Sequence, residues 1–599
     1  MRLFSTRRAR TAVIAVAVGS LALTGCGSSG SDTETKDQSK TQDDAKSQSE
    51  AVAYGDVEAS KGPAAPVEGS REGGTMRIFQ ESDFSHLDPG QIYVSDAGQL
   101  AVLIHRGLTT FVQDDEGKLS VVGDLATDSG TPSEGGKVWT FTLKDGIKDE
   151  DGDPIDSADI RHSIERLYSK HITDGPTYLQ QWLSGDGTAY RDAYEGPYDG
   201  KHLPDSVLET PDEKTIIFKF DKPRADLPQA LTMAGYSIVP DEDDTKEKYD
   251  KAPKALGPYK IAEFSPGKSM KLERNENWDP NTDPKRHAFV DAWDITFNHD
   301  RVDQSKRIAA DRGDAKNAIQ FSGTVDTSQV KSVITNEETN ARTVKGYQPY
   351  VWQLNMNMMR IKDKKIRDAI THALPNGDIL RPDGGTYGGE PAGGLLAPTL
   401  PGYEKGYDPY GKIDKPHGDI EKAKQLLKEA GAEGRTLVYG YANSPHRQKQ
   451  AIIIEKALEK AGFKVEKKEI EGATYYERVG KVENGLDIYM TGWGQDWPSI
   501  STVIPPLYDG TQIADGASNY ARIDDEHVNS EIKRINDITD PQKATPEWQK
   551  LHQYIVEEVN PAAPLYFTKL LQIHGSNVGG VRYSSEKSYI DITRVFLKS

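Results

Sequence analysis

Cysteine is almost absent from the sequence, which has 599 residues and only one cysteine, Cys26. A single thiol cannot form a disulfide within the chain, and it cannot supply the several thiolates of a metal cluster. Long apolar runs are also missing after residue 25, and there is no internal repeat. We therefore expect no later segment to enter a membrane.

Positive charge is in deficit. Lysine and arginine number 74 against 93 aspartate and glutamate residues, which gives a formal net charge of -19. A protein that binds nucleic acid needs a basic surface to meet the phosphates, so this balance argues against such a partner. The length exceeds what one compact core accommodates, and we expect two or three domains.

Metal-binding motifs begin in the sequence but are not completed. The acidic run 149–153 resembles a calcium loop, but its glycine stands at the fourth position, Pro154 occupies the sixth and Ile160 replaces the closing glutamate. His162 and Glu165 have no second histidine to complete an H-E-x-x-H motif. We therefore expect no metal site.

Nucleophile motifs are incomplete as well. Residues 265–268 and 328–331 both spell S-x-x-K, yet neither S-D-N nor K-T-G accompanies them. The sequence has no G-x-S-x-G elbow and no phosphate-binding G-x-x-x-x-G-K-[ST] loop. We expect no catalytic residues and no cofactor. An anchored extracytoplasmic hydrolase, the alternative from another class, would need the residues that are missing.

An export signal is the first feature that the sequence does contain. Residues 1–25 have the pattern of a signal peptide, because the apolar run 11–23 follows four arginines, Arg2, Arg7, Arg8 and Arg10. The sequence Leu-Thr-Gly-Cys that ends at Cys26 resembles the lipobox of bacterial lipoproteins, which implies that this cysteine is acylated. Residues 26–70 contain almost no large apolar side chains and are interpreted as a flexible tether. The route of export, general or twin-arginine, stays open.

Strand and helix patterns alternate in the part that folds. Residues 138–143 place Trp139, Phe141 and Leu143 on one face, which is typical of a half-buried strand. A helix capped by Ser157 is expected to follow.

Residues 419–470 predict an α/β arrangement. Asp419 is expected to cap a helix that ends at Gly431, and a strand over 436–441, a helix around 450–461 and a strand over 464–470 should follow it. This order predicts an α/β lobe.

Five segments resemble, in order, the signature of the family 5 extracellular solute-binding proteins, the peptide and nickel class that serves ABC importers. They are residues 139–167, 257–261 (GPYKI), 272–275 (LERN), 365–373 (KIRDAITHA) and 421–431. The resemblance covers about 73–599. The length and the acylated start are most similar to oligopeptide-binding lipoproteins of Gram-positive actinobacteria.

The resemblance implies an α/β fold with two lobes that close on a ligand in the cleft between them. Lobe one would comprise residues 71–106, 234–350 and 567–599, with an inserted subdomain at 107–233, and lobe two would comprise residues 351–566. The hinge strands would lie at 350–353 and 567–570.

The resemblance also implies an anchor for the ligand's α-ammonium. Peptide-binding members of the family place an aspartate of lobe two against this charge, and a buried ammonium needs such a partner. Residues 491–499, TGWGQDWPS, match the segment that carries it, which places Asp496 on that aspartate. Trp497 and Pro498 follow the acid directly, so the spacing to the proline is shorter than in the family. Whether Trp493 and Trp497 are pocket walls or core stays open.

Other candidate ligand contacts come from both lobes. The strand 351–358 is polar for a buried strand, which indicates that Asn355 or Met356 faces the cleft; a plain strand between the lobes is the alternative. Tyr93 and Ser95, with the neighbouring Asp96, are expected to line the side of lobe one.

We therefore expect a non-enzymatic receptor that captures oligopeptides outside the cell and delivers them to the transmembrane subunits of an ABC permease. It would be a monomer, anchored through Cys26 to the outer face of the cytoplasmic membrane. A nickel or metal-chelate ligand and an oligosaccharide are the alternatives within the family.

Overall fold

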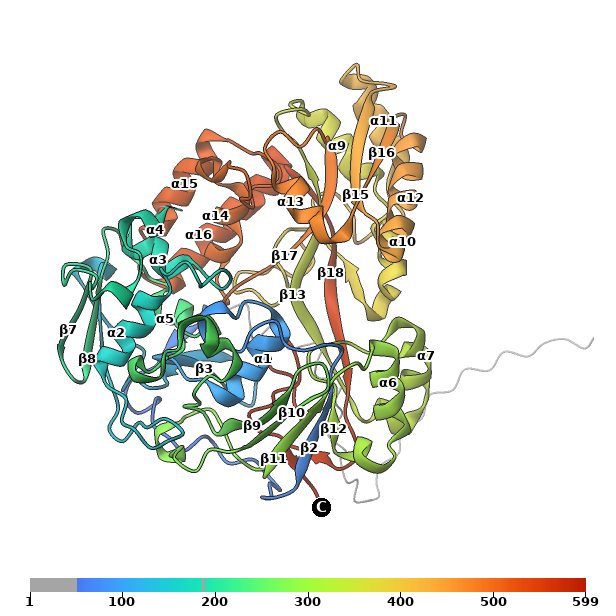
Figure 1. Cartoon of the computed structure of the whole chain (residues 1–599). Helices are drawn as coiled ribbons and strands as arrows, with labels where there is room; N and C mark the ends of the chain where they lie inside the picture. Colours follow the sequence, from blue (N-terminus) through green and yellow to red (C-terminus); the bar gives the residue numbers. More distant parts are fainter. Residues whose placement is uncertain (1–50, 186–188) are drawn as a thin grey trace, which may run out of the picture. The chain divides into compact units, whose positions relative to one another are not determined.

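The computed structural model describes residues 51–185 and 189–599 (Figure 1). We name three parts of the described chain after their main hydrophobic cores. Lobe one surrounds the core that contains Met76 and Leu597, the insert surrounds the core that contains Trp139 and Phe218, and lobe two surrounds the cores that contain Leu354 and Trp548. None of the helices in the described residues is long and apolar enough to cross a membrane.

Lobe one is built on a five-stranded mixed sheet in the order β12-β2-β11-β10-β9. Its strands are β2 (Thr75–Phe79), β9 (Tyr259–Ser265), β10 (Ser269–Arg274), β11 (Ala292–Thr296) and β12 (Ala318–Ile319). Met76 and Ile78 alternate into a core that also receives the apolar face of helix α1 (Ser95–Ile104). Tyr93 lies two residues before this helix, so the packing of α1 fixes where that tyrosine stands.

The insert carries a four-stranded antiparallel sheet in the order β5-β6-β8-β7. The strands are β5 (Thr131–Ser133), β6 (Val138–Thr142), β7 (Leu208–Asp212) and β8 (Thr215–Lys219), and the helices used below are α2 (Ser157–Arg166), α3 (Tyr178–Leu183) and α5 (Leu227–Ala230). The predicted strand is confirmed, with Trp139 and Phe141 buried on one face.

Helix α2 begins where expected but has a different cap. The Asp156 carboxylate accepts hydrogen bonds from the backbone N–H groups of Ala158 and Asp159. The Asp159 carboxylate in turn accepts a hydrogen bond from the backbone N–H of Asp156. Ser157 instead donates its hydroxyl to the carbonyl oxygen of Asp212 at 2.6 Å. The predicted Ser157 cap is therefore wrong by one residue, because two side chains of capping type stand next to each other.

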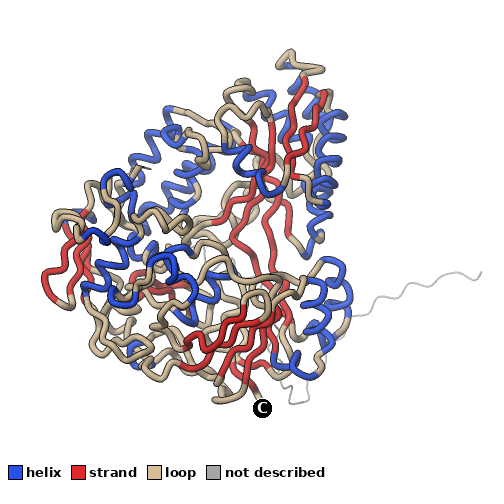
Figure 2. Tube along the Cα trace, in the orientation of Figure 1, coloured by secondary structure: helices blue, strands red, loops and turns tan. Residues whose placement is uncertain are grey.

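Lobe two is built on a six-stranded sheet in the order β14-β18-β13-β17-β15-β16, visible among the red strands of Figure 2. The strands are β13 (Thr343–Met356), β14 (Gly389–Pro391), β15 (Thr436–Ala442), β16 (Lys464–Ile470), β17 (Ile488–Gly494) and β18 (Ala562–Ile573). The helices are α9 (Lys364–Ala373), α11 (Ile420–Glu429), α12 (Pro445–Lys460), α15 (Glu526–Asn536) and α16 (Pro541–Tyr554). The elements predicted in 419–470 are confirmed, and Asp419 caps α11 by accepting from the N–H of Lys422.

The two longest strands, β13 and β18, run side by side and antiparallel from lobe one into lobe two (Figure 1). They pair from Thr343 with Ile573 at one end to Asn355 with Ala562 at the other. Their register shifts between Tyr347 and Val351 and again between Trp352 and Gln353. The irregular stretch thus falls in the region where the sequence predicts a hinge.

The folded part includes residues that the sequence assigns to the tether. Strand β1 (Ala53–Tyr54) pairs in parallel with β4 (Leu119–Gly123), which itself pairs with β3 (Thr109–Gln113). Further along, the carbonyl oxygen of Ser60 accepts from the ammonium of Lys144 at 2.7 Å. The interpretation of residues 51–70 as a tether is therefore wrong. This segment is held mainly by backbone pairing and hydrogen bonds, and few of its side chains, among them Val52 and Val67, are large, apolar and buried, so composition does not indicate that it is ordered.

Candidate functional site

Asp496 lies in the loop that follows β17 and meets side chains from two other parts of the chain. The hydroxyl of Tyr93, in lobe one, donates to Asp496 Oδ1 at 2.9 Å. The hydroxyl of Tyr178, the first residue of α3 in the insert, donates to Asp496 Oδ2. The predicted ligand anchor thus lies where lobe one, the insert and lobe two meet.

Burial dominates the electrostatics of this carboxylate. It raises the pKa of Asp496 above the ordinary value for aspartate, although the hydrogen bonds from Tyr178 and Tyr93 work in the opposite direction. Burial, with the charge of Asp496, also raises the pKa of Tyr178, so its hydroxyl keeps its proton. In the described part of the chain no lysine, arginine or histidine forms an ion pair with Asp496. Among residues 51–185 and 189–599, the carboxylate thus has two hydrogen-bond donors and no counter-charge.

The backbone at Gly90 in lobe one and the backbone at Gly175 in the insert are packed closely together, which brings the two tyrosines near each other. A Cβ atom on Gly175 would lie 2.2 Å from the carbonyl oxygen of Gly90, so this glycine permits the close approach. Gln91 reinforces it, because its side-chain oxygen accepts from the N–H of Thr173 at 3.2 Å. Tyr93 and Tyr178 follow these contacts in the sequence.

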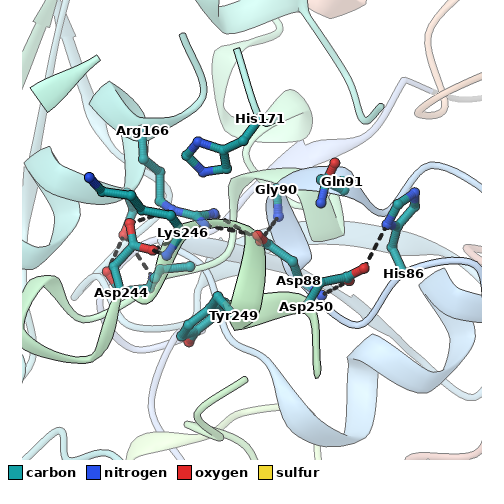
Figure 3. A network of polar contacts seen from close by, with 12 residues as sticks. His86, Asp88, Gly90, Gln91, Arg166, His171, Asp244, Lys246, Tyr249 and Asp250 are labelled. Atoms are coloured by element: carbon teal, nitrogen blue, oxygen red, sulfur yellow. Dashed lines mark hydrogen bonds and ion pairs between the residues drawn. The ribbon is translucent and has the colours of Figure 1, made fainter. Parts of the chain in front are cut away.

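A buried ionic network holds the segment before Tyr93 in place (Figure 3). Arg166, from α2, donates to both carboxylate oxygens of Asp88 at 2.8 Å and to Asp244 at 3.0 Å. Burial alone would raise the pKa of Asp244, but the hydrogen bond with His162 and the charge of Arg166 lower it well below its usual range. This network ties lobe one to the insert and leaves Tyr93 at the end of a rigid segment.

A cavity of about 1340 Å³ opens beside these groups. Tyr93 and Tyr178, the two residues bonded to Asp496, both line it. Its other walls come from segments at 51–52 and 222–229 and from lobe two, including Trp493, Trp497 and helices α15 and α16. Sites for small molecules occupy about 300–1,000 Å³, so this space is large enough for a ligand of several residues.

The two tryptophans of TGWGQDWPS have different surroundings. Trp493 is partly exposed, packs against a lobe-two core and donates its indole N–H to the carbonyl oxygen of Thr502 at 2.9 Å. Trp497 is only 3% exposed and donates to Asp226 of the insert at 3.3 Å. Both tryptophans therefore pack in a core and line the cavity, and Trp497 is the more deeply buried of the two.

The expectation that Asn355 or Met356 faces a cleft is contradicted. Both residues lie in β13, an interior strand of the six-stranded sheet, and are 1% and 0% exposed. The Asn355 side chain donates to Thr491 at 2.8 Å and accepts from Gln353 at 3.1 Å. Polarity in this strand therefore reflects a buried hydrogen-bond network and no ligand contact.

The lobe-one candidates have accessible side chains. Tyr93 is 52% exposed even though it bonds Asp496, and Ser95 is exposed beside the Tyr350 hydroxyl at 3.4 Å. The Asp96 carboxylate instead accepts a hydrogen bond from the side-chain amide of Gln80 at 3.0 Å. The structure thus brings Tyr93 and Asp496 together and places Ser95 against the irregular part of β13.

Sequence reasoning missed Tyr178, which bonds Asp496, and Asp226, which bonds Trp497. Tyr178 is 318 positions from the carboxylate it bonds, and it belongs to a short helix with no motif around it. Only the topology brings these residues together, so a single sequence offers no signal for them. Cys26 lies outside the described residues, and among those that are described no cluster of three or more histidine, cysteine or acidic side chains has the arrangement of a metal site.

Comparison with known proteins finds a matching family model and several related binding proteins. The family model described as bacterial extracellular solute-binding proteins, family 5 Middle, matches residues 120–515. The glutathione-binding protein GsiB of Salmonella paratyphi A is 22% identical over 509 residues, which cover 83% of this chain and 90% of GsiB. GsiB of Escherichia coli K12 gives the same identity and coverage.

Solved structures share the fold. Clavulanic acid biosynthesis oligopeptide binding protein 2 superposes with a TM-score of 0.81 at 27% identity, covering 92% of this chain and 100% of that one. The oligopeptide-binding protein AppA of Bacillus subtilis, in complex with a nonapeptide, has a TM-score of 0.64 at 19% identity and covers 88% of this chain and 99% of its own. The two-lobed α/β fold expected from the sequence is confirmed.

Proposed function

Because the chain belongs to the family 5 bacterial extracellular solute-binding proteins, we propose that it captures peptides with a free α-amino group for an ABC importer. It acts by binding and release, without catalysis, and the ligand stabilises the closed arrangement of the lobes. The names of its relatives, binding proteins for glutathione and for oligopeptides, support a peptide as the ligand class.

The observation that carries the proposal is the state of Asp496. This carboxylate is half-buried, desolvation raises its pKa, and it forms no ion pair with the described residues. Burying an uncompensated charge is costly, and an α-ammonium would supply the missing positive charge together with N–H donors. Tyr93 and Tyr178 fix the carboxylate from two sides, so an arriving ammonium meets a preorganised partner.

The rest of the peptide would be held without reading its sequence closely. An extended chain needs partners for its backbone N–H and C=O groups, and strand edges and ordered waters supply them for any sequence. The 1340 Å³ cavity beside Asp496 gives varied side chains room.

The alternatives make different demands on the site. A sugar would use the exposed aromatic rings and would not need the Asp496 charge. A nickel chelate would need no ammonium partner. Asp496 with its two tyrosine donors favours the peptide over both.

Location and partners complete the proposal. The lipobox-like sequence at 23–26 supports acylation of Cys26 and attachment to the outer face of the cytoplasmic membrane. The receptor would act there as a monomer and pass its ligand to the transmembrane subunits of the permease.

Native mass spectrometry of the purified protein tests the ligand class. We expect bound species whose masses and fragments correspond to peptides with an unmodified amino terminus. Recovery of a sugar or a nickel chelate instead, together with no measurable binding of a peptide mixture, would reject the proposal.

A further inference from the structure

The loop that carries Asp496 is fastened to the insert. Trp497, the next residue, enters a small core made mainly of other parts of the chain, with Val52, Phe111, Leu119, Val121 and Ala230 as its buried members. Its ring lies edge-on to Tyr178 and Trp182, with centroids 4.8 and 6.2 Å away. This packing anchors the loop at the residue adjacent to the proposed ligand partner.

One carboxylate of the insert bonds the loop at two positions. Asp226, which precedes helix α5, accepts from the indole N–H of Trp497 at 3.3 Å. The same oxygen, Oδ2, accepts from the hydroxyl of Ser501. Asp226 therefore fixes the loop after Asp496 at two points four residues apart.

We call the core around Trp497 the Trp497 seat. The segment that begins at residue 51 contributes to it. Strand β1 pairs with β4 and thereby places Val52 against Trp497. The carbonyl oxygen of Ala51 accepts from the side-chain amide of Gln542, in α16 of lobe two, at 3.2 Å. Residues 51–54 thus contact both the insert and lobe two beside the site.

We propose that Asp226 is a positioning residue for ligand binding: by holding Trp497 and Ser501, it places the Asp496 carboxylate where the ligand's ammonium arrives. This inference rests on the proposed function and deepens it. It assigns the insert, through Asp226 and the Trp497 seat, a direct share in the specificity for free-amine ligands. Release of the ligand then requires either that Trp497 leaves its seat or that the insert moves together with the loop.

Substitution of Asp226 in the mature chain tests the proposal. Asp226→Ala removes both hydrogen bonds, whereas Asp226→Asn keeps an oxygen acceptor. We expect Asp226→Ala to weaken a free-amine peptide about tenfold, the size of one lost hydrogen bond to a charged group, and to change the N-acetylated peptide less than about twofold. Asp226→Asn should restore most of the affinity. Asp192→Ala, which removes an exposed carboxylate from the same insert, is the matched control.

The outcomes separate this inference from the proposed function. Equal losses for both peptides would make Asp226 a structural residue only and would overturn the inference, as would unchanged affinity in Asp226→Ala. Asp496→Asn runs beside these variants. If it leaves free-amine binding unchanged, the ammonium anchor fails and both proposals fall. If it abolishes the preference while Asp226→Ala keeps it, only the inference falls.

A spectroscopic measurement reports the seat directly. With 5-fluorotryptophan in the chain, the ¹⁹F resonance of position 497 can be assigned by its loss in Trp497→Phe. We expect Asp226→Ala to shift this resonance towards the solvent-exposed position, while Asp192→Ala leaves it in place. An unshifted resonance in Asp226→Ala would contradict the role of Asp226 in holding the loop.

Discussion

At the scale of single residues, Asp496 illustrates what a sequence reveals and what it hides. Its place in TGWGQDWPS was enough to single it out, because the family pattern supplied the role. The hydroxyl groups of Tyr93 and Tyr178, which fix its geometry, come from other parts of the chain. Asn355 is the opposite case, because its polar side chain suggests a ligand contact but forms hydrogen bonds with Gln353 and Thr491 inside the sheet. Polarity alone does not distinguish a ligand contact from a buried network.

Peptide affinity should fall as the pH falls. Only the ionised form of Asp496 attracts an ammonium, and burial raises the pKa of this carboxylate, so protonation begins at a higher pH than for an ordinary aspartate. Below the pKa of the free protein, affinity should decrease about tenfold for each pH unit. Isothermal titration calorimetry from about pH 7, where the α-amino group is still charged, to about pH 4.5 measures this with free-amine and N-acetylated peptides. Asp496→Asn is the control and should show no such dependence; the same flat profile in the unaltered protein would contradict the ammonium anchor.

At the scale of helices and strands, local patterns were reliable where periodicity and caps agree. Strands β6, β15 and β16 and helix α11 lie where the sequence predicts them, since alternation, capping and Gly431 all indicate the same boundaries. Segment 51–70 differs from these elements because it contributes few apolar side chains to the core. Pairing with β4 and a hydrogen bond from Lys144 hold it instead. Pairing between distant segments leaves no local signal in the sequence.

The cap of α2 gives a prediction at this scale. Asp156→Ala removes the acceptor for two backbone N–H groups and should lower the free energy of unfolding by about 1 kcal/mol. Urea denaturation followed by circular dichroism measures the change. Asp145→Ala, which alters an exposed aspartate nearby, is the control and should differ little from the unaltered protein. Comparable losses in the two variants would contradict the assigned cap.

At the scale of the whole molecule, the order of segments could not be derived from local pattern. Lobe one draws its core from residues as far apart as Met76 and Leu597. Strands β13 and β18 connect both lobes although their sequences lie more than two hundred positions apart. Only the resemblance to a known family indicated this discontinuous arrangement, because composition and periodicity carry no information on which distant strands pair.

Acid should destabilise the fold below about pH 6.5. Burial lowers the pKa of His105 to about 4, that of His552 to about 3 and that of His574 to about 4. Between about pH 6.5 and the lower pKa values of the folded state, these histidines are protonated in the unfolded chain but neutral in the folded chain. The free energy of unfolding therefore decreases as the pH falls through this range. Each histidine should contribute about 1.4 kcal/mol per pH unit.

Urea denaturation at pH 7 and at pH 5 measures this loss. His552→Gln should reduce the pH dependence, because it removes one of the buried histidines. A free energy of unfolding that stays constant between the two pH values would contradict the account of the buried histidines.

Membrane attachment is a second prediction for the whole molecule. Cys26→Ala removes the thiol that a lipid would modify and should move the protein from the membrane fraction to the soluble fraction. Fractionation and the intact mass of the purified protein measure this together. Retention of the variant on membranes, or an unmodified Cys26 in the mature protein, would reject the anchor.

The central claim is that Asp496 recognises the α-ammonium of a peptide, and a double-mutant cycle measures this most directly. Calorimetry would give the affinities of one peptide, with a free and with an acetylated amino terminus, for the unaltered protein and for Asp496→Asn. The account predicts a coupling free energy of about 2 kcal/mol between the carboxylate and the ammonium. A coupling within about 0.5 kcal/mol of zero would contradict it.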